Sequence, residues 1–179
     1  MRSMMNAAKP ALKAVGVAAG VAACLVGGVG VAPSGWAYDA TINGTYTATL
    51  VGQWATWNEV YHAQPLMRNT WRLSSSCENA QDCQGQISSD AGWTARMYTH
   101  DGSSWTMKRD IPNWARCPDG RTFLGQEVIV FYSADPDTGA HKLGSPVFAG
   151  WDATTSSSGA CNTNQPIVIR QPFRLDRIS

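Results

Sequence analysis

The sequence predicts an all-β domain: an antiparallel β-barrel or sandwich of about eight strands, with one short helical segment and two disulfides. Three observations predict this class. After residue 37 the chain is a series of short segments rich in Thr, Tyr, Trp, Val and Ile, turn residues separate these segments, and the four cysteines of this part form an even number. A closed barrel is slightly favoured over a sandwich, because closure removes exposed strand edges.

Residues 1–37 have the three-part layout of a secretory signal. Residues 1–13 are basic, residues 14–32 are apolar and rich in Ala and Gly, and small residues follow at Gly35 and Ala37. This layout predicts cleavage after Ala37. An exported protein with no membrane span after cleavage is therefore expected.

Two alternatives to a cleaved signal remain open. The apolar run is long enough to stay in a bilayer as a helix, although its Ala and Gly content makes it weakly hydrophobic. Cys24 ends a Val-Ala-Ala-Cys stretch that resembles a bacterial lipobox, so lipid anchoring at Cys24 is a minor alternative. Residues 38–179 contain no linker or internal repeat, which predicts a single secreted domain.

The charge of this domain excludes some partners. The chain has 14 Lys and Arg residues against 13 Asp and Glu residues. Three of those bases, Arg2, Lys9 and Lys13, lie in the first 37 residues, which contain no acid; fourteen minus three leaves 11 bases against 13 acids, a charge of about −2. An acidic domain without a basic block argues against nucleic acid as the main partner.

Strands are expected wherever β-forming residues run between turn signals. The predicted strands are 44–51, 70–77, 83–90, 92–99, 103–111, 121–133 and 145–154, followed by IVIR and PFRLDRI near the C-terminus. His100-Asp101-Gly102 predicts a hairpin turn, because Asp-Gly readily supplies positive φ values. Asp119-Gly120 and the DPDTG stretch of residues 135–139 predict further turns.

One segment departs from the strand pattern. In residues 54–68, Trp54, Trp57 and Tyr61 recur at i, i+3 and i+7, and Pro65 follows. This spacing predicts a short helix that covers one end of the barrel.

The four cysteines that follow the signal predict disulfides, since an exported protein meets an oxidising environment. Three pairings are possible. Cys77 and Cys83 fall on the apolar side of two alternating segments joined by a short polar loop, so we expect them to pair and to leave Cys117 with Cys161. Chain entropy then predicts a stabilisation of roughly 2 to 2.5 kcal/mol from the short loop and about 4 kcal/mol from the long one. A zinc site is not expected, because no pair has CxxC spacing and no histidine is near a cysteine.

Tryptophans are the main candidates for ligand contact. Trp71 and Trp105 are in phase with apolar neighbours, which predicts a place in the core. Trp54, Trp57 and Trp114 lie in irregular segments beside polar residues, and aromatic faces of this kind bind sugars, lipids and other ligands.

Catalytic motifs are lacking: the chain has no nucleophile elbow, no HExxH and no phosphate-binding loop. Glu127 is a weak candidate, because it lies in an apolar run where burial would raise its pKa. The alternative to a catalytic role is that Glu127 forms an ion pair with Arg96 or Arg121. A glycan hydrolase would need a second carboxylate, for which the candidates are Asp90, Asp101 and Asp110.

Other polar residues carry no reactive pattern. His62, His100 and His141 each lie alone in polar segments and are expected at the surface. Asp135 and Asp137 begin like a calcium loop but lack its third acid and its final glutamate, which predicts an acidic turn. No metal and no cofactor are expected.

A family resemblance adds to this interpretation. The motifs GTYTA, GQWATWN, NTWRLSSSC with CQGQISSD, WTMKRD, NWARCPDG and PFRL cover nearly all of residues 44–175. With these spaced tryptophans, cysteines and glycines the chain resembles small secreted or envelope-associated proteins of mycobacteria and related actinobacteria, most of them uncharacterised. Similar patterns occur in extracellular parts of some membrane-anchored kinases of these bacteria. The resemblance implies export, disulfides and a binding or sensing role, and it carries over no catalytic residue.

The sequence thus predicts a secreted, disulfide-stabilised, non-catalytic module that binds an envelope or host ligand, whether glycan, lipid or protein. Two alternatives stay open: an envelope-glycan hydrolase that uses a carboxylate pair, and a structural protein whose edge strands pair with a partner.

Overall fold

The computed structural model of the chain describes residues 38–179. The predicted signal with Cys24 lies outside the described residues. The strands are β1 (Gly44–Leu50), β2 (Thr56–Trp57), β3 (Val60–Tyr61), β4 (Met67–Cys77), β5 (Cys83–Ser89), β6 (Thr94–Thr99), β7 (Ser104–Arg116), β8 (Thr122–Ser133), β9 (Val147–Ser156) and β10 (Val168–Arg177). Two 3-10 turns, η1 (Gly52–Trp54) and η2 (Ala160–Asn162), complete the elements.

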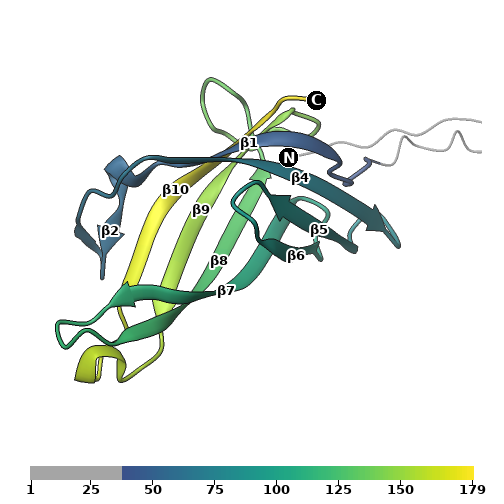
Figure 1. Cartoon of the computed structure of the whole chain (residues 1–179). Helices are drawn as coiled ribbons and strands as arrows, with labels where there is room; N and C mark the ends of the chain where they lie inside the picture. Colours follow the sequence, from purple (N-terminus) through teal and green to yellow (C-terminus); the bar gives the residue numbers. More distant parts are fainter. Residues whose placement is uncertain (1–37) are drawn as a thin grey trace, which may run out of the picture. The chain divides into compact units, whose positions relative to one another are not determined.

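Eight of these strands form a closed antiparallel barrel. The strand order is β1-β4-β5-β6-β7-β8-β9-β10, and β1 also pairs with β10, which closes the sheet. Figure 1 shows the long strands β7 to β10 forming one wall and β1 and β4 the other. The predicted fold class is confirmed, and the barrel is chosen over the sandwich. Within residues 38–179, no helix has the length and apolar character that crossing a membrane would need.

The core fills the barrel because one side chain in two points inward along each strand. Its largest members include Trp71, Trp105, Phe131 and Phe173, each at most 2% exposed. Phe131 and Phe173 contact each other, with ring centroids 5.8 Å apart. The predicted core positions of Trp71 and Trp105 are therefore confirmed.

Both predicted disulfides are present. Cys77 and Cys83 stand opposite each other in the register of β4 and β5, and their sulfurs are bonded. Cys117, just after β7, is bonded to Cys161 in η2, so this bridge ties the β7–β8 hairpin to the connection between β9 and β10. The pairing of Cys77 with Cys83 follows from strand alternation, and it leaves Cys117 for Cys161.

The helix predicted over residues 54–68 is wrong. Only η1 is helical there, and β2 and β3 form a small hairpin instead. Asn58 and Glu59 make the turn at positive φ. The Asn58 side chain accepts a hydrogen bond from the Val168 amide, and the Asn58 amide donates to the Val168 carbonyl. Part of this backbone is thus bonded to β10, and β2 also pairs with β3, so these backbone groups have strand partners in place of helical ones.

Candidate functional site

Four polar side chains occupy the barrel interior toward the end where the β2–β3 hairpin lies. They are Arg109, Glu127, Asp152 and Gln171, one from each of the four consecutive strands β7 to β10. Arg109 stands opposite Glu127, and Asp152 stands opposite Gln171. Glu127, Asp152 and Gln171 are 4%, 1% and 8% exposed, and Arg109 is partly buried. We call these four residues the interior polar cluster.

Strand alternation explains why these residues point inward. Arg109 follows the core residue Met107 by two positions, and Glu127 precedes Ile129 by two. Since the side-chain period of a strand is two, each polar residue shares the inner face with its apolar neighbour. Buried polar groups of this kind need partners within the barrel.

The Arg109 guanidinium supplies one of these partners. Its Nε donates to a carboxylate oxygen of Glu127 and forms an ion pair with it. The guanidinium carbon also lies 4.0 Å from the centre of the Trp93 ring, an attractive cation–π arrangement. The predicted pairing of Glu127 with Arg96 or Arg121 is wrong: Arg96 faces outward and Arg121 pairs with Asp119, because only the barrel register brings Arg109 to Glu127.

Asp152 is the residue of this cluster that sequence reasoning missed. Its Oδ2 accepts a hydrogen bond of 2.8 Å from Gln171 Nε2, while its Oδ1 is buried without a hydrogen-bond partner. Burial, together with the negative charge of Glu127, raises the pKa of Asp152 to about 7, although the Gln171 bond and Arg109 act in the opposite direction. The signal in the sequence is strand alternation: Asp152 follows the buried Phe148 on β9 by four residues, so the two side chains lie on the same face of the strand.

Aromatic side chains complete this layer of the barrel. The Trp71 ring lies 5.2 Å from Trp93 and 5.2 Å from Phe173, centre to centre. Phe173 shares the inner face of β10 with Gln171. Trp93 therefore contacts both Arg109 of the polar cluster and Trp71, which in turn contacts Phe173. The indole nitrogen of Trp71, like Asp152 Oδ1, is buried without a hydrogen-bond partner.

Trp114 lies at the same end because of a β-bulge. The pairing of β7 with β8 shifts between Ile111 and Ala115, and Asn113 within this stretch has a positive φ. The Trp114 indole covers Gly125: a β-carbon at Gly125 would lie within 2.6 Å of two indole carbons. Gly125 therefore leaves room for the ring, which also contacts Phe123 edge to face at 5.7 Å.

Trp57 and Trp54 lie near the same end. Trp57 stands opposite Ile169 on β10. Ile169 precedes Gln171 by two residues, so both belong to the same face of β10. Its ring is 37% exposed and meets His62 edge to face. Trp54 is 65% exposed in η1, which contacts β10. All three candidate ligand tryptophans thus gather at one end of the barrel, and their role in binding stays a prediction.

The acids considered as partners of Glu127 are not brought to it. Asp110 is exposed on β7, on the face opposite to Arg109. Asp90 is exposed in the β5–β6 turn, and its carboxylate accepts a hydrogen bond from the amide of Thr70 on β4. Asp101 accepts hydrogen bonds from the amides of Ser103 and Ser104 in the β6–β7 turn. The acid that does lie beside Glu127 is Asp152.

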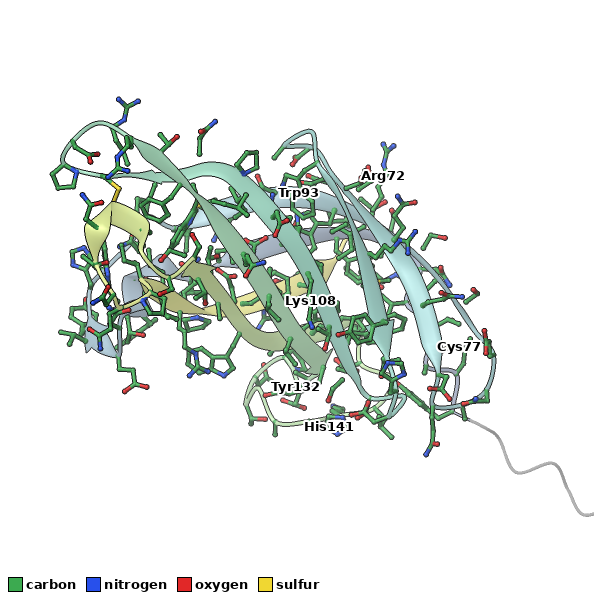
Figure 2. The ribbon with its side chains drawn as sticks, turned by 90° about the horizontal axis from the view of Figure 1, so that it is seen from below. Arg72, Cys77, Trp93, Lys108, Tyr132 and His141 are labelled. Atoms are coloured by element: carbon green, nitrogen blue, oxygen red, sulfur yellow. A yellow bond between two sulfur atoms is a disulfide. The ribbon has the colours of Figure 1, made fainter. Side chains whose placement is uncertain are left out.

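The remaining predicted surface residues are found at the surface. His62, His100 and His141 are exposed. The Asp135 carboxylate accepts hydrogen bonds from the amides of Asp137 and Thr138 within its own turn, as an acidic turn requires. Figure 2 labels His141 near Tyr132, with which its ring is in contact at 5.7 Å.

Taken together, fold and site define a class: a disulfide-stapled, closed eight-stranded barrel with a polar cluster inside and tryptophans at one end. No family model matches the chain, and neither does any curated protein. Among solved structures, the chain is similar to the sensor domain of M. tuberculosis PknI in its monomer form. The identity is 17% and the TM-score 0.53, over 77% of this chain and 88% of that one. The likeness is one of fold.

Proposed function

We propose that the protein is a secreted, non-catalytic binding module that acts at the cell envelope or outside the cell, with its signal removed after Ala37. Two disulfides support an oxidising compartment. The solved structure of similar fold is a sensor domain, which agrees with a binding or sensing role. The acidic domain supports a partner other than nucleic acid.

The ligand is proposed to bind at the end of the barrel that carries Trp54, Trp57 and Trp114. The observation that carries this proposal is their convergence: a hairpin on β10 and a bulge in β7 place residues far apart in the sequence at one end. Trp54 and Trp57 keep much of their surface exposed, as a ligand would require. Mouths of β-barrels are common places for ligands.

A binding role accounts for the site better than hydrolysis does. A glycan hydrolase needs one carboxylate free to act as a nucleophile or base beside a second acid. Glu127 is held by Arg109 inside the barrel, and Asp152 beside it is 1% exposed. Pairing through edge strands is also less favoured, because closure leaves the two-residue strand β3 as the short free edge of the described sheet.

Replacing Trp57 and Trp114 together by Ala tests the proposal. The purified protein is mixed in turn with a neutral oligosaccharide, an acyl lipid and peptidoglycan fragments, and its melting temperature is followed. We expect one class to raise it by about 4 °C or more at saturating concentration. The double variant should lose this shift, because stacking on both indoles is removed.

Trp151→Ala is the matched control. Trp151 is 51% exposed on the outer wall of β9 under Arg170, so its loss should leave the ligand-induced shift unchanged. If no ligand class shifts the melting temperature of the parent protein, or if Trp151→Ala loses the shift equally, the barrel end is not the binding site.

A further inference from the structure

The outer wall of the barrel holds a feature that the aromatic end does not involve. An open groove of about 730 Å³ runs over β4, β5 and β6. Its floor includes the backbone of Ser75, Gly85 and Met97. The side chains that border it are Ser74, Ser76, Gln84, Gln86, Arg96 and Tyr98.

Strand register arranges these side chains in two rows across the wall. One row runs Ser74, Gln86, Arg96 and Lys108, and the other runs Ser76, Gln84, Tyr98 and Thr106. Directly opposite residues on one face of a sheet lie about 5 Å apart at their β-carbons. The wall is therefore a continuous array of hydroxyl, amide and cationic groups with no aliphatic side chain between them.

The positive charge of this array is unusual for the domain. Arg96 and Lys108 stand directly opposite each other on neighbouring strands, and both are exposed. Like charges in this position repel and destabilise a sheet. Residues 38–179 carry more acids than bases. Asp110, the nearest outward acid on β7, falls in the next row, and Lys108 lies just beyond the residues that line the groove. An anionic group bound between the two cations would relieve their repulsion.

The second row adds an aromatic ring. Tyr98 is partly buried on this wall, and the ammonium group of Lys108 lies 5.9 Å from its ring centre. Figure 2 labels Lys108 and Arg72, which stand on strands on either side of β5 and β6. Hydroxyl and amide groups bind sugar hydroxyls, an aromatic ring stacks on sugar faces, and Arg binds carboxylates with two parallel hydrogen bonds.

We propose that this groove binds a glycan chain that bears carboxylates. Arg96 binds a carboxylate, Lys108 adds positive charge from just beside the groove, and Ser74, Gln84 and Gln86 hydrogen-bond the hydroxyls of adjoining sugars. This function goes beyond the ligand proposed at the tryptophan end and uses a separate surface of the barrel.

Calorimetric titration of the purified protein tests this proposal. The probes are an oligogalacturonide and a neutral cello-oligosaccharide of equal length. We expect the acidic chain to bind and the neutral chain to bind at least tenfold more weakly. Arg96→Gln should weaken the binding of the acidic chain by about tenfold, since it removes a charge-assisted pair.

Arg68→Gln is the matched control. Arg68 is exposed on the same strand β4 but does not border the groove, so the same change of charge there should alter the affinity less than twofold. The Trp57 and Trp114 double variant should bind the acidic chain like the parent, which separates this result from that of the barrel end.

Three outcomes overturn the proposal. They are an acidic chain that does not bind, a neutral chain that binds equally well, and an Arg68→Gln variant that loses as much affinity as Arg96→Gln. The last outcome would mean that general attraction by positive charge, and not the groove, holds the acidic chain.

Discussion

Asp152 is the residue whose chemistry most depends on its place in the barrel. In the sequence it follows Trp151 in an ordinary strand segment. In the fold it lies beside a second buried acid, Glu127, with one oxygen bonded to Gln171 and the other without a partner. A carboxylate of this kind is costly to keep ionised, since burial and a neighbouring negative charge both favour its protonated form.

Asp152→Asn should therefore change how stability depends on pH. The folded-state pKa is about 7 and the ordinary value is 3.8. Between these values the folded protein retains a proton that the unfolded chain has lost, so the contribution of Asp152 makes the free energy of unfolding fall as the pH rises from 3.8 to about 7 and level off above that pH. The variant should lose this decline and, at pH 8, exceed the parent in stability by on the order of 1–3 kcal/mol.

Urea unfolding at pH 5 and pH 8 measures this effect. Asp110→Asn is the control, because Asp110 is exposed on β7 and its replacement should leave the pH dependence of the parent unchanged. Equal pH slopes for the parent and Asp152→Asn would contradict the perturbed titration of Asp152.

At the scale of elements, the bulge in β7 decides where Trp114 points. Ile111 pairs with Gly125 and Ala115 pairs with Phe123, so β7 advances by four positions while β8 advances by two. The Trp114 indole within this bulge lies against Gly125. Extra residues of this kind re-aim a side chain at the rim of a barrel. The strand predicted over residues 103–111 ends at Ile111, whereas β7 in the structure continues to Arg116. The bulge allows this, because it accommodates Pro112, which cannot donate a hydrogen bond to a neighbouring strand.

Gly125→Ala should displace the Trp114 ring. The added methyl group would meet the indole and also Thr154, whose methyl carbon would be 2.9 Å away, so we expect a destabilisation of about 1–3 kcal/mol. Chemical denaturation followed by tryptophan fluorescence measures it. In a Trp114→Ala background the cost of the same substitution should shrink, and an unchanged cost there would show that the ring is not what the methyl group meets.

The β2–β3 hairpin shows how a correct observation led to a wrong element. Trp54, Trp57 and Tyr61 do recur with helical spacing, but β2 pairs with the distant strand β10 and with β3. The turn needs a positive φ at Asn58, and asparagine adopts this conformation at a lower energetic cost than most residues. Pairing with a distant strand, which no local window contains, outweighed the periodicity.

At the scale of the whole molecule, closure and the two disulfides hold residues 38–179 together as one barrel. The Cys117–Cys161 bridge joins connections at the tryptophan end, and the Cys77–Cys83 bridge closes the β4–β5 hairpin. Figure 1 shows η2 beneath the β7–β8 hairpin at this end of the barrel. The Cys117–Cys161 bridge therefore holds the connections near the proposed ligand site in place.

An intact mass of the exported protein tests the predicted domain as a whole. We expect a chain that begins at Tyr38, is lighter than its reduced form by about four hydrogens, and does not react with thiol reagents, because both disulfides are formed. A lipid-modified chain beginning at Cys24, or a chain of full length, would contradict cleavage after Ala37.

Local pattern was enough to predict the strands of the barrel, the hairpin turns, the core tryptophans and the pairing of Cys77 with Cys83, because side-chain alternation and turn chemistry act over a few residues. Long-range register was needed to predict the rest. Arg109 meets Glu127, Asp152 meets Gln171 and Trp57 reaches β10 because the closed sheet aligns strands that are distant in the sequence. The polar cluster and the outer groove exist through this alignment, since each is assembled across several strands and no single segment contains it.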